Sequence, residues 1–153
     1  MRIGEICTRE VVYCGRADSV LEVARLMRNH HVGDLIVAER RDGRLEPVGI
    51  VTDRDLVVKV LAEGVAPATL TAGDLMTRSL LAAEESATVH EAIERMRAEG
   101  VRRLPVISAD RSLIGVLSVD DVAEFLAEEL GGLARIGPRQ SALEKAALPP
   151  VDG

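Results

Sequence analysis

The sequence predicts an α/β (α+β) fold of two β-α-β-β-α units that pack together as a pseudo-twofold pair. Three observations predict this fold: a long internal repeat, a glycine-hydroxyl-carboxylate segment that occurs once in each copy, and an apolar content of 47% in 153 residues. That length suits one ordinary domain or two small repeats packed as one. Because one repeat is too small to bury its own sheet face, the two copies are expected to cover each other.

The repeat is found by laying Gly4 on Gly73, after which the two copies align without a gap as far as Ala38. The segments that begin at Gly49 and Gly115 align with a slightly smaller shift, so the first copy has three extra residues in the loop before its segment. Self-similarity at a fixed offset is typical of a duplicated supersecondary unit.

Each copy is predicted to contain a lead-in segment, a brief strand, a helix, a hairpin of two strands and a second helix. The first helix of each copy begins at a capping box, Ser19 with Glu22 or Thr88 with Glu91, and continues with apolar residues at helical spacing. Asp42-Gly43 is a turn signal inside the charged first hairpin loop. The expected ranges, first copy then second, are lead-ins 3–7 and 75–76, first strands 10–13 and 80–83, first helices 20–27 and 89–96, hairpins 34–38 with 47–51 and 104–107 with 113–117, and second helices 56–61 and 122–126.

These elements divide the chain into residues 1–66, which hold the first repeat and its lead-in, residues 67–131, which hold the second repeat, and a tail at 132–153. The linker is expected at 64–70. Gly131-Gly132 is expected to interrupt the last helix, and Gly137-Pro138 to stop it. The tail is therefore predicted to be flexible.

The composition argues against several partners. A net charge of −6 disfavours nucleic acid, because phosphate binding needs a basic face. Tyr13 and Phe125 are the only aromatic residues, so a bound base would lie against aliphatic side chains. The N-terminus shows no apolar signal core, and no apolar run reaches the roughly 20 residues of a membrane span, so we expect a cytoplasmic protein without a membrane partner. Cys7 and Cys14 are expected to be reduced, small apolar residues.

In each glycine segment a hydroxyl residue, Thr52 or Ser118, stands three positions before a carboxylate, Asp55 or Asp121. A strand that ends at the hydroxyl and continues as a helix exposes the first N–H groups of that helix, which attract anions. A carboxylate has two acceptor oxygens that can bind both vicinal hydroxyls of a ribose. The same pattern is also an ordinary helix cap, worth about 1 kcal/mol, and both interpretations stay open.

With this repeat, these segments and the Arg-Leu-Pro-Val run at 103–106, the chain resembles a tandem cystathionine β-synthase (CBS) domain pair, also named a Bateman module. The resemblance covers residue 1 to about residue 130 and includes no catalytic domain. It implies a regulatory sensor that binds an adenosine-containing ligand (AMP, ADP, ATP or S-adenosylmethionine) between the repeats. It also implies a homodimer, no required cofactor, and a regulated protein that the sequence does not identify.

The resemblance assigns site residues as well. It places the ribose-binding carboxylate at Asp55 and Asp121, and the hydroxyl that meets ribose or phosphate at Thr52 and Ser118. The phosphate candidates are Arg102, Arg103 and Arg54, and the adenine-pocket candidates are Tyr13, Val37, Ala82 and Val106.

The two copies differ in charge just before the second strand, where the first has Gly33-Asp34 and the second has Arg102-Arg103. The cleft that the arginines reach is expected to bind the nucleotide phosphates. The other cleft is expected to be empty, weaker, or suited to a less anionic adenosine ligand. An ordinary solvated arginine pair is the alternative.

The sequence gives less support to metal binding and to catalysis. The aspartates at 53, 55, 120 and 121 are typical of solvated helix N-termini, so no dedicated metal site is predicted, although Mg²⁺ could accompany a nucleotide. His30, His31 and His90 have no partner at ligand spacing. No nucleophile, base and orienting group stand together, so we predict no enzyme. The alternative function is a ligand-free dimerisation or docking module for a partner protein, formed by an aliphatic face and the tail.

Overall fold

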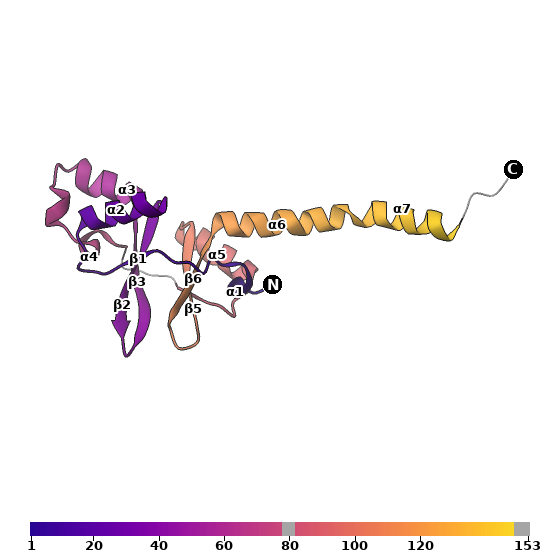
Figure 1. Ribbon diagram of the computed structural model, residues 1–153, viewed down its shortest axis with the longest axis horizontal. Helices are drawn as coiled ribbons and strands as arrows, with labels where there is room; N and C mark the ends of the chain where they lie inside the picture. Colours follow the sequence, from indigo (N-terminus) through magenta and orange to yellow (C-terminus); the bar gives the residue numbers. More distant parts are fainter. Residues whose placement is uncertain (78–81, 149–153) are drawn as a thin grey trace.

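The computed structural model describes residues 1–77 and 82–148 and contains two three-stranded sheets, each covered by helices (Figure 1). Each sheet joins one parallel pair to one antiparallel pair in the order β1-β2-β3 or β4-β5-β6, so the predicted fold class is confirmed. The elements are α1 (Ile3–Ile6), β1 (Tyr13–Cys14), α2 (Val20–His30), β2 (Asp34–Arg41), β3 (Arg44–Thr52), α3 (Asp53–Leu56), the π-helix η1 (Val57–Leu61), the 3₁₀ turn η2 (Pro67–Thr69), α4 (Ala72–Leu75), β4 (Ala83–Glu84), α5 (Val89–Glu99), β5 (Arg103–Ile107), β6 (Leu113–Ser118), α6 (Val119–Ala134) and α7 (Ile136–Ala147).

The hairpin of the first repeat turns at Asp42-Gly43, as the sequence predicts. Both residues have positive φ, 49° and 79°, which is the requirement of a two-residue type I′ turn. The flanking charged residues continue the ladder, with Glu39 paired to Glu46, so β2 and β3 are longer than predicted. The charged residues of 39–46, which the sequence predicted as a loop, lie at the exposed end of the hairpin, where their side chains stay solvated.

The first strand of each repeat is shorter and later than predicted. β1 holds only Tyr13 and Cys14, which pair in parallel with Ile36 and Val37. The segment before β1 was expected to be a strand from residue 10, and it lines a cleft between the repeats instead. β4 begins at Ala83, and the positions 80 and 81 of its predicted range lie outside the described residues.

Each lead-in segment packs on the core of the other repeat. Ile3 of α1 is fully buried in the second core, and Thr8 pairs with the edge residue Val116. Leu75 of α4 is buried in the first core in the same way, and a residue equivalent to Thr8, Thr77, pairs with Ile50. The two repeats are therefore held together by an exchange of lead-in segments. Because each lead-in packs on the other repeat, a single boundary in the sequence does not separate the two packing units. The boundaries at 66 and 131 stay predictions.

The glycines that open the repeated segments allow this exchange. A Cβ atom on Gly49 would stand 2.5 Å from the Sδ atom of Met76, and one on Gly115 would stand 2.7 Å from the Sγ atom of Cys7. Cβ atoms do not approach other heavy atoms so closely in real proteins. Each of the two strands has a glycine, which carries no side chain, at the point where a lead-in segment packs closely across it.

The predicted end of the last helix was wrong. α6 runs through Gly131 and Gly132, and α7 includes Gly137 and Pro138. Pro138 is the third residue of α7, within a first turn whose N–H groups need no intrahelical acceptor, so the helix tolerates it. In Figure 1 the two helices lie end to end and project away from the sheets. Among the described residues, no helix combines the length and apolar character that a bilayer crossing requires.

Candidate functional site

Two clefts lie between the repeats, at positions that the internal repeat relates. The larger is named here the Thr52 cleft, and its volume is about 590 Å³. Thr52 and Arg54, at the β3–α3 junction of the first repeat, face Arg102 and Arg103 of the second repeat across it. The arginines therefore share a cleft with the first junction, a pairing that the sequence left open. All three phosphate candidates line this cleft.

The smaller cleft is named the Ser118 cleft, and its volume is about 190 Å³. Ser118 and Asp121, at the β6–α6 junction, line it together with the acidic residues Glu10 and Asp34 of the first repeat. Pockets for drug-sized ligands occupy roughly 300–1,000 Å³, so of these two clefts the Thr52 cleft alone has the volume of such a pocket. The two clefts differ in the balance of charge: three arginines and two acids, Asp34 and Asp53, line the Thr52 cleft, whereas one arginine and three acids line the Ser118 cleft.

Arg103 and Asp34 line both clefts and form an ion pair where the clefts adjoin. The Nε atom of Arg103 lies 2.8 Å from the Oδ2 atom of Asp34, whose side chain is 14% exposed. Burial raises the pKa of Asp34, and the guanidinium of Arg103 opposes that rise without cancelling it. Arg102 is far more exposed, at 73%, and its nearest acid is Asp120 at 3.8 Å. Arg102 is therefore the less restrained of the two arginines.

Both hydroxyl-carboxylate pairs form complete capping boxes. The Thr52 N–H donates to the Oδ2 atom of Asp55 at 2.9 Å, and the Asp55 N–H donates to the Oγ1 atom of Thr52 at 3.2 Å. The same exchange joins Ser118 and Asp121, at 2.7 and 3.1 Å. The helix-cap interpretation is thus confirmed for both segments. A cap occupies one carboxylate oxygen, so it leaves the other for a further partner.

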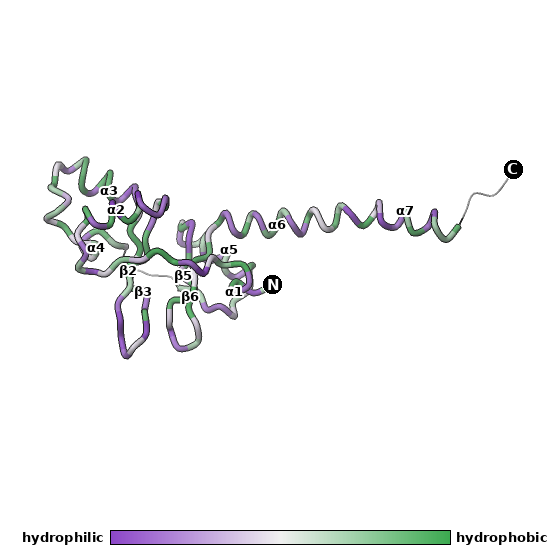
Figure 2. The backbone as a smooth tube through the Cα atoms, in the orientation of Figure 1, coloured by the Kyte–Doolittle hydropathy of each residue, from purple (hydrophilic) through white to green (hydrophobic). Residues whose placement is uncertain are grey.

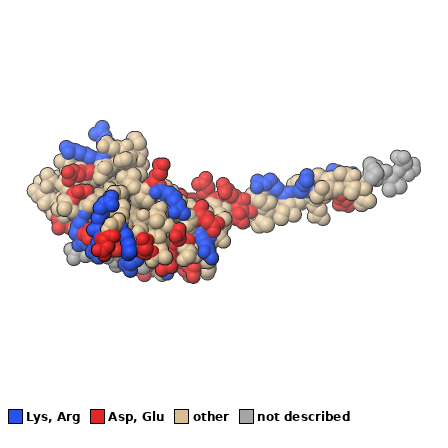
Figure 3. Space-filling view, turned by 60° about the horizontal axis from the view of Figure 1, so that its bottom comes forward, with Lys and Arg blue, Asp and Glu red and all other residues tan. Residues whose placement is uncertain are grey.

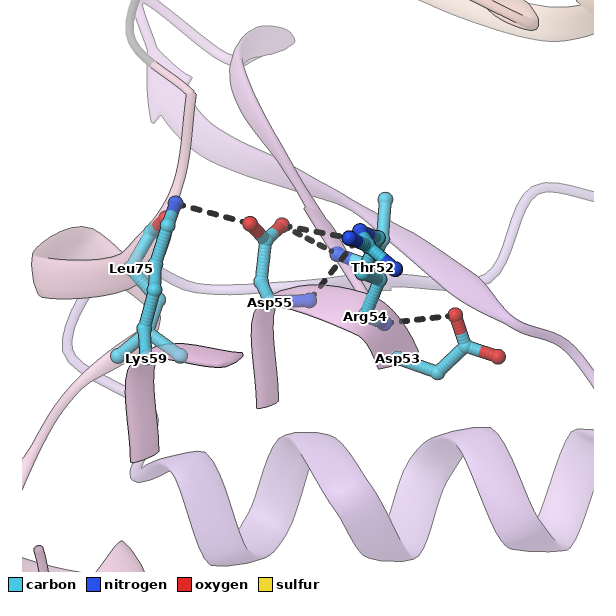
Figure 4. Close-up of polar contacts among 6 residues, drawn as sticks. All are labelled: Thr52, Asp53, Arg54, Asp55, Lys59 and Leu75. Atoms are coloured by element: carbon cyan, nitrogen blue, oxygen red, sulfur yellow. Dashed lines mark hydrogen bonds and ion pairs between the residues drawn. The ribbon is translucent and has the colours of Figure 1, made fainter. Parts of the chain in front are cut away.

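The two caps differ in what meets that second oxygen. The Nζ atom of Lys59 lies 2.8 Å from the Oδ1 atom of Asp55 and also donates to the carbonyl of Leu75 at 2.9 Å (Figure 4). Burial by itself would raise the pKa of Asp55, but the hydrogen bonds from Lys59 and Thr52 outweigh burial and lower the pKa. The second repeat has Phe125 in place of Lys59. In the part of the chain that the structure describes, the carboxylate of Asp121 makes hydrogen bonds only with Ser118.

The adenine candidates need a correction. Val37 and Val106 have no exposed surface, and each packs inside the core of its own repeat. Their strand neighbours Ile36 and Pro105 line the clefts instead, because successive side chains of a strand point to opposite faces. Counting this alternation from the buried leucines of β2 and β5 would have identified them.

The other two adenine candidates lie elsewhere. Tyr13 is 41% exposed, and Ala82 lines a separate hollow beside Arg16 and Arg111. The Thr52 cleft also contains Thr77, which the candidate residues did not include. Its repeat partner Thr8 lines the Ser118 cleft, so the internal repeat was the signal that could have found both.

Residues 1–77 and 82–148 contain no cluster of side chains suited to metal binding or to thiol chemistry. No three His, Cys, Asp or Glu side chains in these ranges come together as a metal site would need. Cys7 and Cys14 are free and buried. Burial raises the pKa of the Cys14 thiol to about 12 and raises that of Cys7 as well, so both thiols stay protonated at neutral pH.

The fold is a pair of repeats with two clefts between them, which is the arrangement of a tandem domain pair. The family model of the CBS domain matches residues 3–62 and 72–128. The chain belongs to the CBS domain family, and the resemblance seen in the sequence is confirmed.

Known relatives and solved structures agree. The chain is 37% identical over 124 residues to hypoxic response protein 1 of Mycobacterium tuberculosis, covering 81% of this chain and 84% of the relative. An uncharacterized protein of Methanopyrus kandleri is 34% identical over 80% of this chain, which spans 61% of that relative. A crystal structure of hypoxic response protein I with two coordinated zinc ions has a TM-score of 0.70 at 34% identity, covering 81% and 98% of the two chains. A CBS domain protein of Pyrobaculum aerophilum complexed with AMP has a TM-score of 0.71 at 26% identity, covering 79% and 89%.

Proposed function

We propose that this protein is a regulatory module that binds an adenine nucleotide in the Thr52 cleft and reports its occupancy to a partner protein. One observation carries the proposal: Arg54, Arg102 and Arg103 converge on the hydroxyl-capped β3–α3 junction in a cavity of about 590 Å³. Three guanidinium groups supply the fixed positive donors that phosphate oxygens prefer. AMP bound to a structurally similar CBS domain protein supports the ligand class.

Within this proposal, the ribose binds to Thr52, which lines the cleft, and to Asp55, which is hydrogen-bonded to Thr52 but does not itself line the cleft. The Oδ2 atom of Asp55 is engaged by the cap and the Oδ1 atom by Lys59, so the ribose hydroxyls take a place beside or instead of the ammonium group. Arg102 is exposed and weakly paired, so it reaches the phosphates first. Pro105 and Ile50 give the adenine an aliphatic wall. Mg²⁺ accompanies only the ligands that carry two or more phosphates.

Arg103 couples the two clefts in this scheme. A phosphate in the Thr52 cleft competes with Asp34 for the guanidinium of Arg103, and Asp34 then adds an unpaired negative charge to the Ser118 cleft. The Ser118 cleft already holds Glu10 and Asp121, so a second phosphate ligand is disfavoured there. We therefore propose that this smaller cleft stays empty or weakly binds a ligand without phosphate, whose affinity depends on what the Thr52 cleft binds.

The test is a set of calorimetric titrations of the purified protein with AMP, ADP, ATP, adenosine and S-adenosylmethionine. Arg102→Ala is expected to weaken AMP and ATP at least tenfold and to change adenosine binding little. Arg28→Ala removes the same charge from the exposed end of α2 and is the matched control. Absence of binding by any nucleotide at millimolar concentration, or equal losses in both variants, would overturn the proposal. A bound ligand at 100 times its Kd adds about 2.7 kcal/mol to the free energy of unfolding, which thermal unfolding detects as a rise in Tm.

The helical surface of the first repeat favours association between copies. Val57, Val58 and Leu61 of η1 are 54%, 46% and 76% exposed, and Val65 follows them at 38%. Exposed apolar residues in one patch are typical of a protein interface. We propose that this patch, named the η1 patch, forms a homodimer interface through which ligand binding is transmitted. Leu61→Asp is expected to lower the sedimentation-derived mass without changing the unfolding temperature of the dissociated chain.

If nucleotide titrations show no binding while the η1 patch still associates, the ligand-free docking function replaces the sensor.

A further inference from the structure

The C-terminal helices extend into solvent without a partner. The segment from Glu124 to Ala147, named here the rod, leaves the body of the molecule along a single line (Figure 1). Val122 is the only residue of α6 that is buried, and α7 has none. Phe125, at the start of the rod, packs against the second core. The other large apolar side chains of the rod have exposed fractions between 44% and 67%, and they are Leu126, Leu130, Leu133, Ile136 and Leu143.

These side chains share one side of the rod. Leu126 and Leu133 are seven residues apart, as are Ile136 and Leu143, and the two sets stand at a and d positions of one heptad pattern, whose remaining d and a positions hold the polar Glu129 and Gln140. In Figure 2 apolar and polar positions alternate along the whole rod, as an amphipathic helix requires. The opposite side carries Glu124 and other polar or small residues. The rod therefore has a seam suited to a second helix.

The composition of the rod makes an unpartnered helix costly. Gly131, Gly132 and Gly137 each weaken a helix by about 1 kcal/mol relative to alanine. Most helical stability in proteins comes from packing of the apolar face, and this helix packs on nothing past its first turns. A partner that covers the seam would supply that packing.

The charges of the rod select the partner and its direction. Every charged side chain from Asp120 to Glu129 is acidic, whereas three of the four from Arg135 to Lys145 are basic. Figure 3 shows the acidic side chains gathered where the rod leaves the body and basic ones farther out. Two rods that run in the same direction would place acid against acid. Two rods that run in opposite directions place the acidic half of each against the basic half of the other.

We propose that the rod binds the rod of a second copy of this chain in an antiparallel helix pair. The heptad pattern sets a register in which Leu126 lies against Leu143 of the second copy and Leu133 lies against Ile136 of the second copy. Arg139 then lies beside Glu129 of the second copy. Because the pair is two-fold symmetric, each contact is made twice.

The same register accounts for an apolar groove at the base of the rod. The groove lies between α5 and α6, has a volume of about 390 Å³, and is lined by Ile93, Val119, Val122 and Leu126 among others. The register brings the end of the second rod, from Leu143 to Ala147, to this groove. This association does not rest on nucleotide binding or on the η1 patch, which belongs to the other repeat.

A distance measurement on the full-length chain tests the pair. A spin label is attached at Ala147→Cys, an exposed position, while Cys7 and Cys14 are buried and protonated at neutral pH. In the antiparallel register each label lies opposite residue 122 of the other copy, so the labels are offset by 25 residues of helix, about 37 Å. A parallel pair would bring the labels to about 10 Å. A homodimer formed only through the η1 patch would leave the label distances broad.

Leu133→Glu, in the centre of the seam, is expected to abolish the distance near 37 Å. Ala142→Glu adds the same charge to the opposite side of the rod and is expected to keep it. Because Leu133 is 65% exposed, its replacement leaves the body folded, which circular dichroism verifies. Glu129→Arg and Arg139→Glu are each expected to weaken association, and the double variant to restore it. A parallel distance, no defined distance, or a distance that Leu133→Glu leaves unchanged overturns the proposal.

Discussion

Asp34 and Arg103 occupy the same position in the two repeats, and their side chains form an ion pair with each other, with 2.8 Å between the Oδ2 and Nε atoms. A duplicated protein in which both positions had kept the same charge would have two like clefts and a repulsion between them. Here the acid and the base pair where the clefts adjoin, so their charges offset each other, and the remaining charges are mostly arginines in the Thr52 cleft and only acids in the Ser118 cleft.

Replacement of Asp34 by asparagine is expected to strengthen AMP binding about three- to tenfold. The reason is that Arg103 loses its ion pair with Asp34 and is then free to pair with a phosphate in the Thr52 cleft. Calorimetry of wild type and variant measures the change. Asp110→Asn removes an equally negative but exposed acid, paired with Arg44, and is the control for net charge. Equal gains in both variants would show that bulk charge, and not the ion pair, limits binding.

The pH dependence of stability is expected to carry the signature of Asp34. Burial raises the pKa of Asp34 above its ordinary value of 3.8 in the folded protein. Its contribution to stability is therefore fully present below pH 3.8 and is lost as the pH rises through the folded pKa. The free energy of unfolding of Asp34→Asn, relative to wild type, should rise across that window in urea denaturation.

Asp55 is expected to show the opposite sign. The pKa of Asp55 is lowered below 3.8, because the hydrogen bonds from Lys59 and Thr52 outweigh its burial. Its contribution to stability is present above pH 3.8 and is lost as the pH falls through the folded pKa. Asp55→Asn should therefore lose stability relative to wild type as the pH rises through this range. A slope of the same sign in Asp34→Asn and Asp55→Asn would contradict one of the two assignments.

Asp55→Ala is expected to abolish AMP binding and to cost about 1 kcal/mol of stability, which is the loss of a helix cap. Glu22→Ala is the matched control, because Glu22 and Ser19 form the same capping box at the start of α2, outside both clefts. Glu22→Ala should cost a similar free energy of unfolding and leave AMP affinity unchanged. Fluorescence or calorimetric titration combined with urea unfolding of the two variants separates the cap from the ligand. If the Asp55→Ala variant still binds AMP, the carboxylate of Asp55 acts only as a helix cap and not as a ligand-binding group.

Gly49→Ala and Gly115→Ala are expected to destabilise the protein by about 1–3 kcal/mol each, through forced overpacking. In both cases the new methyl group meets the lead-in of the other repeat, at Met76 or at Cys7. Gly132→Ala in α6 meets no heavy atom within 4 Å and should be neutral or stabilising. Thermal unfolding measures all three. A loss in Gly132→Ala equal to the other two would show that the cost is not steric.

Much of the fold could be read from local patterns. The capping boxes at Ser19 and Thr88 locate the starts of α2 and α5, because a cap depends on residues only three apart. Asp42-Gly43 locates the hairpin turn for the same reason. The opposed charges of Asp34 and Arg103 predicted two unequal clefts before their contact was known.

Other features depend on contacts that no local pattern contains. The exchange of lead-ins and the pairing of the Thr52 junction with Arg102 and Arg103 join residues that are far apart in the sequence. The helix through Gly131 and Gly132 also differs from the prediction, because a glycine weakens a helix by about 1 kcal/mol without ending it.

The sequence by itself determined that the chain is a duplicated α/β unit with a capped strand-helix junction in each copy, since repetition, alternation and capping are properties of neighbouring residues. Only the tertiary structure decided which junction faces which charges, which side chains line a cleft and which fill a core. The physical reason is that a cleft is formed by side chains brought together from both repeats, and their proximity is set by the packing of the whole chain.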